Sequence, residues 1–403
     1  MKPIYIISLI LIFLSYNPSY SQQSRSSKRQ TPKNGPILPA AYTPGDYIPL
    51  LEGRKTGIVA NHTSLIYKTH LVDSLIALGI NVVKIFGPEH GFRGDQPDGK
   101  EISNTRDPKS GVEVISLYGA HRRPTAADME GLEIMLFDIQ DVGTRFYTYI
   151  STLTYVMEAC AENGIPLILT DRPNPNGFYV DGPVLDTTFS SFIGLHPVPV
   201  VYGMTIGEYA AMVNGEIWLK GGKPCEITII KCKNYTHNSQ YQLPVNPSPN
   251  LQDMKAIYLY PSLCFFEGTI ISVGRGTPFP FKVFGHPEYM AGSFTFTPEP
   301  IRGVCEDPPL KGQLCHGQNL SEAAEILKKN GKLELFWLIE TYKSMGSRND
   351  FFNGYFDKLA GGTTLKEQII SGMSLTDIRN SWQQDLTEFK KIRKKYLLYP
   401  DFK

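Results

Sequence analysis

Between residue 55 and about residue 235, short extended apolar runs alternate with segments of helical periodicity, and this alternation constrains the fold most. The extended runs include TGIVAN, NVVKIF, VEVISLYG, LEIMLFDI, IPLILTD and VPVVYG. Strands that are apolar along their whole length are typical of a parallel sheet covered by helices on both faces. We therefore predict an α/β fold with a Rossmann-like parallel sheet domain over residues 45–240.

The clearest helical segment follows Gly143. Its apolar residues recur every three or four positions, which predicts that one face of this helix packs into the core. We expect Thr144 to be its N-cap, so that Arg145 lies in the first turn. The residues on the apolar stripe are Tyr149, Leu153, Val156, Met157 and Cys160.

The pattern changes after QYQLPVNPSPNL, residues 240–251, where three prolines in a short span indicate a domain junction. Beyond it come short mixed segments and a helical C-terminus, so we predict a smaller α+β auxiliary domain over residues 250–403. Its last long helix is expected to pack through Ile378, Trp382, Leu386, Phe389 and Ile392.

The N-terminus has the features of an export signal. Lys2 precedes an apolar stretch from Ile4 to Leu14, followed by small residues up to Ser21. This stretch is too short to span a bilayer. We expect a signal peptide over residues 1–21, a flexible leader over residues 22–44, and a mature protein in the periplasm without stable membrane insertion.

Composition excludes several other classes. The net charge is +1 with 20% charged residues, which favours neither nucleic acid nor an acidic membrane as partner. The six cysteines include no Cys-x-x-Cys, and the eight histidines are scattered, so no metal site is expected. In an oxidising compartment, Cys305 and Cys315 could close a small hairpin.

Polar side chains gather where four of the expected strands end. Ligands bind at the carboxyl ends of parallel strands, so these residues are expected to form a substrate site. Aspartates at such positions can also cap helices or organise turns, which leaves a structural alternative open for each of them. The residues are Asn61, then Glu89, His90 and Arg93, then Asp138, Asp141 and Arg145, and finally Asp171 and Arg172.

Glu89 fits a structural role least well. It stands between Gly87-Pro88 and His90-Gly91, so it lies on no helix face and in no alternating strand. A carboxylic acid close to Phe86 and Phe92 could keep its proton and act as a general acid on a glycosidic oxygen.

Arginines near the expected helix N-terminus indicate an anionic substrate. Arg145 would lie in the first turn of that helix, and Arg93 and Arg172 come from neighbouring loops. Free backbone N–H groups and guanidinium groups together bind carboxylate or phosphate. In the second half, Glu267, Arg275 and His286 lie in irregular, Gly-rich segments that are expected to line an interdomain cleft.

Motifs for nucleotides and serine catalysis are missing from the sequence. It contains no G-x-G-x-x-G after the first strand, no P-loop, and no G-x-S-x-G, so we expect no cofactor. Carboxylates together with arginines, asparagines and tyrosines suit a polar, neutral or anionic small molecule, and a sugar fits well.

The motifs GPEHGFRG, FDIQDVGTRFYTYISTL, DRPNPNG, GMTIGEYA, NPSPNL, YPSLCFFEGT and GRGTPFPF together resemble the exo-β-N-acetylmuramidases. The resemblance runs from about residue 45 to the C-terminus. It implies a Rossmann-type domain with an auxiliary domain, and release of N-acetylmuramic acid from the non-reducing ends of peptidoglycan-derived muropeptides. It also implies a catalytic role for Glu89 and for a tyrosine of TRFYTY. We assign Tyr147, because Tyr149 lies on the core stripe.

Several points stay open at this level. The lactyl carboxylate of N-acetylmuramic acid is expected to bind one of the arginines, and Arg145 is the first choice because the helix dipole would reinforce it. Asp141 is the expected partner of Glu89, whereas retention, inversion and participation of the acetamido group remain alternatives. An exported sugar-binding protein without turnover is the main alternative. A serine hydrolase using Ser116 or Ser151 is less well supported.

Overall fold

The computed structural model describes residues 35–89, 91–93 and 105–402. The expected signal peptide, most of the expected leader, and His90 lie outside these residues. Residues 36–403 form one compact unit. Part of the expected leader is folded into it, because Leu38 pairs with Lys233 and Ala40 and Ala41 are buried.

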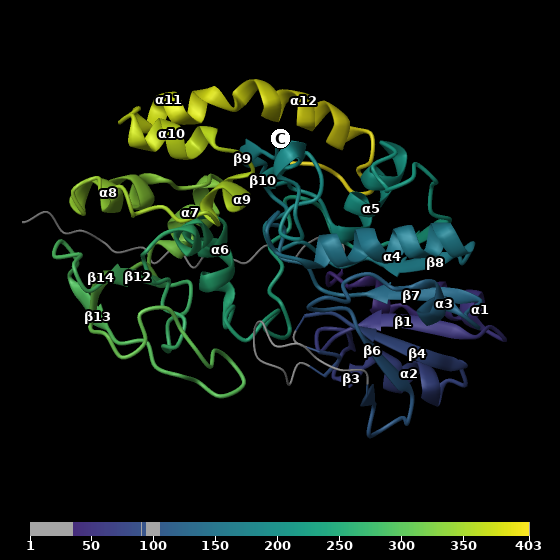
Figure 1. Cartoon of the computed structure of the whole chain (residues 1–403). Helices are drawn as coiled ribbons and strands as arrows, with labels where there is room; N and C mark the ends of the chain where they lie inside the picture. Colours follow the sequence, from purple (N-terminus) through teal and green to yellow (C-terminus); the bar gives the residue numbers. More distant parts are fainter. Residues whose placement is uncertain (1–34, 90, 94–104, 403) are drawn as a thin grey trace, which may run out of the picture. The chain divides into compact units, whose positions relative to one another are not determined.

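A seven-stranded sheet forms the centre of the N-terminal half (Figure 1). Its order is β11-β8-β7-β1-β4-β6-β5, and every neighbouring pair is parallel except β5 with β6. The strands are β1 (Thr56–Ala60), β4 (Val82–Gly87), β5 (Thr105–Arg106), β6 (Glu113–Ser116), β7 (Ile134–Asp138), β8 (Leu167–Thr170) and β11 (Ile227–Ile230). The predicted α/β class with its parallel sheet is confirmed.

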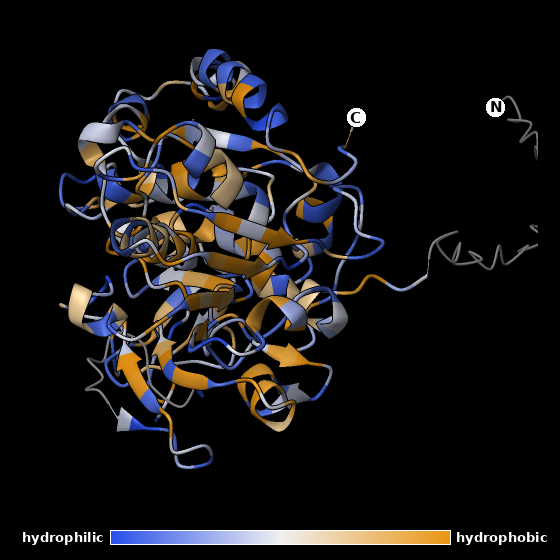
Figure 2. Ribbon diagram, turned by 90° about the vertical axis from the view of Figure 1, so that its right-hand side faces the viewer, coloured by the Kyte–Doolittle hydropathy of each residue, from blue (hydrophilic) through white to orange (hydrophobic). Residues whose placement is uncertain are grey.

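Helices cover both faces of this sheet, as apolar strands require. In β1, Val59 packs into the same core as α4, whereas Ile58 packs with α2 on the opposite face. Figure 2 shows the strands as largely hydrophobic ribbons between these layers. The helices of this half are α1 (Ile48–Leu51), α2 (Leu71–Ala77), α3 (Ala126–Met129), α4 (Tyr149–Asn163) and α5 (Ile206–Gly215).

One local expectation is wrong. The run VPVVYG does not enter the parallel sheet: β10 (Pro199–Val201) pairs antiparallel with β9 (Asp181–Val184) in a separate two-stranded sheet. Instead, the edge position next to β8 is taken by β11. A second small hairpin joins β2 (Leu65–Ile66) to β3 (Thr69–His70).

The C-terminal half is mainly helical, with a three-stranded antiparallel sheet in the order β12-β14-β13. The expected long terminal helix is divided at Trp382, although four of its five apolar residues are buried as expected. The elements are α6 (Met254–Leu263), a 3₁₀ helix η4 (Cys264–Gly268), β12 (Val283–His286), β13 (Phe294–Phe296), β14 (Cys315–Asn319), α7 (Ala324–Asn330), α8 (Phe336–Ser344), α9 (Phe356–Ala360), α10 (Thr364–Ile370), α11 (Leu375–Ser381) and α12 (Gln383–Lys394).

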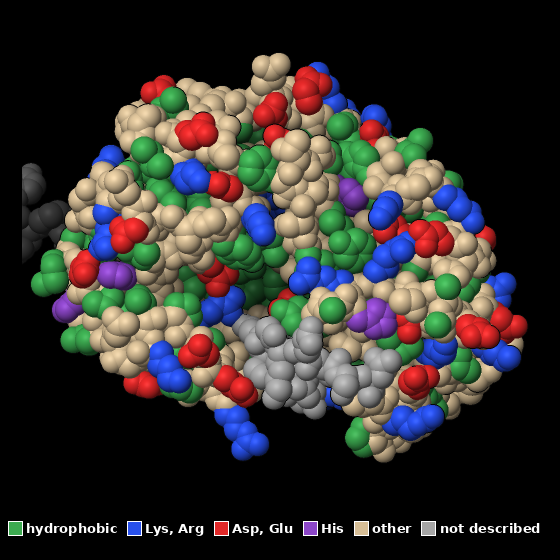
Figure 3. All heavy atoms as spheres, viewed as in Figure 1, with side chains coloured by type: hydrophobic (Ala, Val, Ile, Leu, Met, Phe, Trp, Pro, Cys, Tyr) green, Lys and Arg blue, Asp and Glu red, His purple; other side chains and the backbone are tan. Residues whose placement is uncertain are grey.

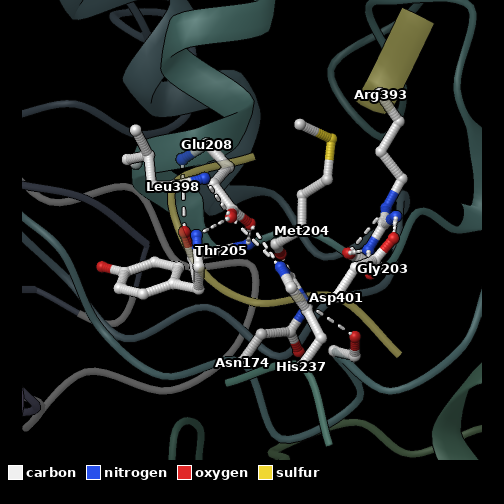
Figure 4. A network of polar contacts seen from close by, with 12 residues as sticks. Asn174, Gly203, Met204, Thr205, Glu208, His237, Arg393, Leu398 and Asp401 are labelled. Atoms are coloured by element: carbon white, nitrogen blue, oxygen red, sulfur yellow. Dashed lines mark hydrogen bonds and ion pairs between the residues drawn. The ribbon is translucent and has the colours of Figure 1, made fainter. Parts of the chain in front are cut away.

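The last residues of the chain return to the N-terminal half through a buried polar network (Figure 4). Glu208 of α5 accepts the backbone N–H of Leu398 at 2.8 Å and lies 3.0 Å from the ring of His237. Arg393 of α12 donates to the carbonyl of Gly203 and to Asp401, both at 2.7 Å. These contacts join the two halves into one body.

The cysteine pair considered above does not form a disulfide. Cys305 lines a large cavity, whereas Cys315 belongs to β14 and packs in a small core with Val283 and Phe296. No helix in the described part of the chain is both long and apolar enough to cross a membrane.

Candidate active site

A cavity of about 850 Å³ opens where the carboxyl ends of β4 and β6 face the C-terminal half. Figure 3 shows this hollow with an apolar floor and charged side chains of both signs at its edge. The floor includes the rings of Phe146, Tyr147, Tyr260 and Phe281. Aromatic rings beneath a few charged groups are the usual composition of a site for a small polar ligand.

Glu89 enters this cavity from the loop that follows β4. Its Oε2 atom accepts a hydrogen bond at 3.0 Å from the hydroxyl of Thr148, the N-cap residue of α4. The carboxylate therefore lies beside the first turn of the 15-residue helix α4. Among the predicted residues, Glu89 is placed where the sequence analysis expected it.

A second carboxylate reaches the cavity from the C-terminal half. Glu267 of η4 pairs with Arg275, with Nε and Oε1 2.5 Å apart. Partial burial and the nearby Cys264, Glu267 and Glu89 together raise the pKa of Tyr355, which also lines the cavity. Glu89 of the N-terminal half and Glu267 of the C-terminal half therefore both raise the pKa of this phenol.

Tyr147 lies in the cavity wall, as the resemblance implied. Its hydroxyl donates to the carbonyl of Pro247 at 2.8 Å, and burial raises its pKa well above the ordinary value. It is therefore a neutral phenol whose hydroxyl is held by the backbone. Pro247 belongs to the expected domain junction, whose residues Ser248, Asn250 and Leu251 form another part of the wall. The catalytic role of Tyr147 stays a prediction.

Asp141 is not placed beside Glu89. It is buried outside the cavity lining, where one oxygen accepts hydrogen bonds from the hydroxyl of Tyr202 and the backbone N–H of Gly143. Burial raises the pKa of Asp141 to about 6. The loop after β7 turns inward here, so the side chain organises that loop. Glu267 takes the place expected for a second carboxylate.

The pKa of Asp141 leads to a testable pH dependence. Since the folded-state pKa of about 6 exceeds the ordinary 3.8, the folded state binds the proton more tightly, and stability falls as the pH rises from 4 to 6. We expect the free energy of unfolding of the wild type, relative to Asp141→Asn, to fall by about 2–3 kcal/mol between pH 4 and pH 7. Denaturant titrations at both pH values measure this. A difference independent of pH would contradict it.

Arg145 is not at a helix N-terminus, and the predicted N-cap is wrong. Thr144 pairs with Val201 and the Arg145 N–H donates to the carbonyl of Val200, so Arg145 lies in a turn beside β10 and α4 begins only at Tyr149. The buried guanidinium donates to the carbonyls of Pro183, Val198 and Leu359. Burial lowers its pKa to about 9. Arg145 therefore joins three segments instead of facing the cavity.

Asp138 and Arg172 form a pair in the interior. Two hydrogen bonds of 2.7 Å join the guanidinium to both carboxylate oxygens, and both side chains are at most 1% exposed. The strand order reverses between β1 and β7, and the polar residues at the carboxyl ends of these two strands bind one another or other buried groups. Asn61, for example, donates to the hydroxyl of Tyr149 at 2.8 Å.

Three further predicted residues are placed elsewhere. Asp171 is buried and accepts the N–H of Gly207 at 2.8 Å in the first turn of α5. Burial raises its pKa to about 6. Arg93 pairs with Asp73 and Asp107 at 3.0 and 2.9 Å. His286 lines a neighbouring cavity of about 720 Å³ that shares Glu267 and Arg275 with the first one.

Arg122, Lys358 and Tyr355 are cavity residues that the sequence analysis missed. Arg122 follows β6, an additional strand end on the edge that carries Glu89. This position was the signal that could have identified it. Lys358 and Tyr355 come from the region of α9, whose sequence has no pattern that indicates a site. Among the described residues, no group of three or more His, Cys, Asp or Glu side chains could hold a metal ion.

The sequence is similar to characterised and structurally known proteins along nearly its whole length. It is 38% identical over 398 residues to the peptidoglycan β-N-acetylmuramidase NamZ of Bacillus subtilis (strain 168), covering 93% of this chain and 94% of that one. A crystal structure of a DUF1343 family protein from Bacteroides fragilis NCTC 9343 shares 45% identity and a TM-score of 0.85, over 91% of this chain and 100% of that one. A second structure of this family from the same organism shares 27% identity and a TM-score of 0.75, over 90% and 99%.

Family models match both halves of the chain. The N-terminal model of the exo-β-N-acetylmuramidase NamZ covers residues 56–255, and the C-terminal model covers residues 258–399. The two models meet close to the proline-rich segment in which a junction was expected. The chain therefore belongs to the exo-β-N-acetylmuramidase NamZ family of glycoside hydrolases.

Proposed function

We propose that this protein is an exo-acting β-N-acetylmuramidase that releases N-acetylmuramic acid from the non-reducing ends of peptidoglycan fragments. The observation that carries the proposal is the position of Glu89, hydrogen-bonded to the N-cap residue Thr148 of α4 and in a cavity lined by aromatic rings. Membership of the family supports the same activity. The expected signal peptide supports action in the periplasm.

In the proposed reaction, Glu89 donates its proton to the glycosidic oxygen as the bond from that oxygen to the anomeric carbon breaks. A water molecule supplies the oxygen that replaces the leaving group, and its proton returns to Glu89. The positive charge that develops on the sugar lies close to the ring of Tyr147 and the carboxylate of Glu267. The candidate nucleophiles for the first step are Glu267, water and the acetamido group of the substrate.

The substrate experiment compares p-nitrophenyl β-N-acetylmuramic acid with the N-acetylglucosamine analogue, using the purified mature chain. We expect nitrophenol release from the muramic substrate and at least tenfold less from the analogue. A glycan labelled at its reducing end should lose single N-acetylmuramic acid residues, detected by mass spectrometry. Binding of the muramic sugar without any release would favour the sugar-binding alternative instead.

Arg275 is the proposed receptor for the lactyl carboxylate. Of the four arginines that were considered, all within the described residues, Arg275 alone lines the cavity, and its side chain is 22% exposed. A charge-assisted hydrogen bond contributes about 1.5–3 kcal/mol. We expect Arg275→Ala to reduce the preference for muramic over glucosamine substrate roughly tenfold or more, measured as the ratio of kcat/KM values.

Two further variants test whether the loss of preference is specific to the guanidinium of Arg275. Arg275→Lys keeps the charge and should retain part of the preference, whereas Arg302→Ala removes an exposed arginine outside the cavity lining and should leave the ratio unchanged. If Arg275→Ala left the ratio of kcat/KM values unaltered, the lactyl carboxylate would bind Lys358 or Arg122 instead.

A further inference from the structure

A second cavity, of about 650 Å³, lies next to the first one. The loop after β6, the outer face of α4 and the loop after α5 form its walls. Arg122 lines both cavities. Figure 3 shows basic side chains beside the hollow, on the side where Figure 1 places α4. A molecule bound in the first cavity can therefore continue past Arg122 into the second.

Aromatic rings form the boundary and the wall of this second cavity. Phe192 of the first cavity stacks on Tyr155 of the second, with ring centres 6.0 Å apart and planes 17° apart. Arg122 lies over the Phe192 ring at 4.6 Å. In the same cavity, the half-buried Trp218 stacks on His196, with ring centres 5.3 Å apart and planes 22° apart. Such flat faces suit the C–H faces of sugar rings.

The charges of the second cavity are not all compensated by the protein. Arg123 pairs with Glu158 and Glu162. Arg122 and Lys220, in contrast, pair with no carboxylate among the described residues, and both are exposed. Two uncompensated cations next to aromatic faces indicate a sugar-containing ligand that carries a carboxylate.

The position of Glu89 decides which part of the substrate would bind here. A general acid must contact the oxygen of the leaving group, so the glycan beyond the scissile bond lies on the side of Glu89. Arg122 follows β6, the strand adjacent to β4, which carries Glu89. The cavity that contains His286 lies instead next to the Glu267–Arg275 pair.

Resting on the function proposed above, we infer that the second cavity binds the glycan beyond the scissile bond, with the sugars on Trp218 and the Tyr155–Phe192 stack. The carboxylate of the next muramyl residue binds Arg122. The protein thus recognises a length of glycan strand as well as the terminal sugar.

The test compares a peptide-free tetrasaccharide of alternating N-acetylmuramic acid and N-acetylglucosamine with the p-nitrophenyl glycoside, which has no glycan beyond the bond. The readout is the ratio of kcat/KM for the tetrasaccharide to kcat/KM for the aryl glycoside. We expect Trp218→Ala to lower this ratio about tenfold, mainly through a higher KM for the tetrasaccharide. Trp337→Ala, a half-buried tryptophan in α8 outside both cavities, is the matched control and should keep the ratio.

A second arm tests the carboxylate. The wild type should prefer the tetrasaccharide with a free lactyl carboxylate on its second muramyl residue over the amidated form, and Arg122→Gln should lose this preference. If neither Trp218→Ala nor Arg122→Gln changed its ratio while the aryl glycoside was still hydrolysed, the inferred role of the second cavity would be wrong, but the proposed function would stand. No turnover of either substrate by the wild type would overturn the proposed function and the inference with it.

Discussion

Glu89→Gln is expected to lower kcat/KM for the p-nitrophenyl muramic glycoside by about 10²–10⁴-fold, the usual contribution of a general acid or base. Glutamine has nearly the same shape, and its amide can keep the contact with the Thr148 hydroxyl. It cannot donate a proton to the glycosidic oxygen, however, so the loss should be mainly in kcat. Because Glu89 is half-buried in a loop, the variant is expected to fold normally.

Two controls separate this effect from other causes. Glu52→Gln makes the same chemical change at an exposed position outside the cavity lining and should leave kcat/KM unchanged. Glu267→Gln removes the other half-buried carboxylate of the cavity and reports on its separate role. If a folded Glu89→Gln variant had wild-type activity, the protein would still be a glycosidase, but its general acid would be a residue other than Glu89.

Asp138→Ala is expected to reduce the free energy of unfolding by about 3–5 kcal/mol. The substitution leaves the guanidinium of Arg172, 1% exposed, without its carboxylate. Burial opposes the charge on Arg172, but Asp138 outweighs it and raises the pKa of the arginine. Without Asp138, an uncompensated charge would remain in the interior at the carboxyl ends of the central strands.

Denaturant titration measures the loss, with an exposed pair as the control. Glu388→Ala breaks the surface contact of Glu388 with Lys391, where both side chains are more than 60% exposed, and should cost about 1 kcal/mol or less. Replacing both partners, in Asp138→Leu combined with Arg172→Met, should recover part of the loss because no charge is then buried. Equal stabilities of Asp138→Ala and the wild type would disprove a structural role for the pair.

The central sheet could be predicted because its strands carry their own signal. Each strand buried on both faces must be apolar along its length, and the helices that cover them must have an apolar stripe, as in α4 with Leu153 and Val156. The prediction failed where the pairing of a strand depends on residues far away in the sequence. The run containing Val200 has the composition of a buried strand, yet it pairs with β9, and no local property distinguishes these outcomes.

The first residue of a helix and the partner of a charged side chain were also hard to predict, because both depend on residues that are distant in the sequence. Threonine is a typical N-cap residue, but the bridge of Thr144 to Val201 holds it outside the helix. Arginine and aspartate at strand ends are equally suited to bind a ligand or each other. Asp138 and Arg172 bind each other, which removes them from the surface of the cavity.

The sequence by itself determined the sheet and its two helical layers and identified Glu89 as the leading candidate residue, because periodicity and a Gly-Pro turn are local properties. The tertiary structure alone decided which charged residues share the cavity with Glu89. Glu267, Arg275 and Tyr355 lie more than 170 positions away in the sequence, and only the packing of the C-terminal half against the ends of β4 and β6 brings them to the same cavity. Such proximity is a property of the folded chain, because distant residues meet only after the intervening segments have been packed.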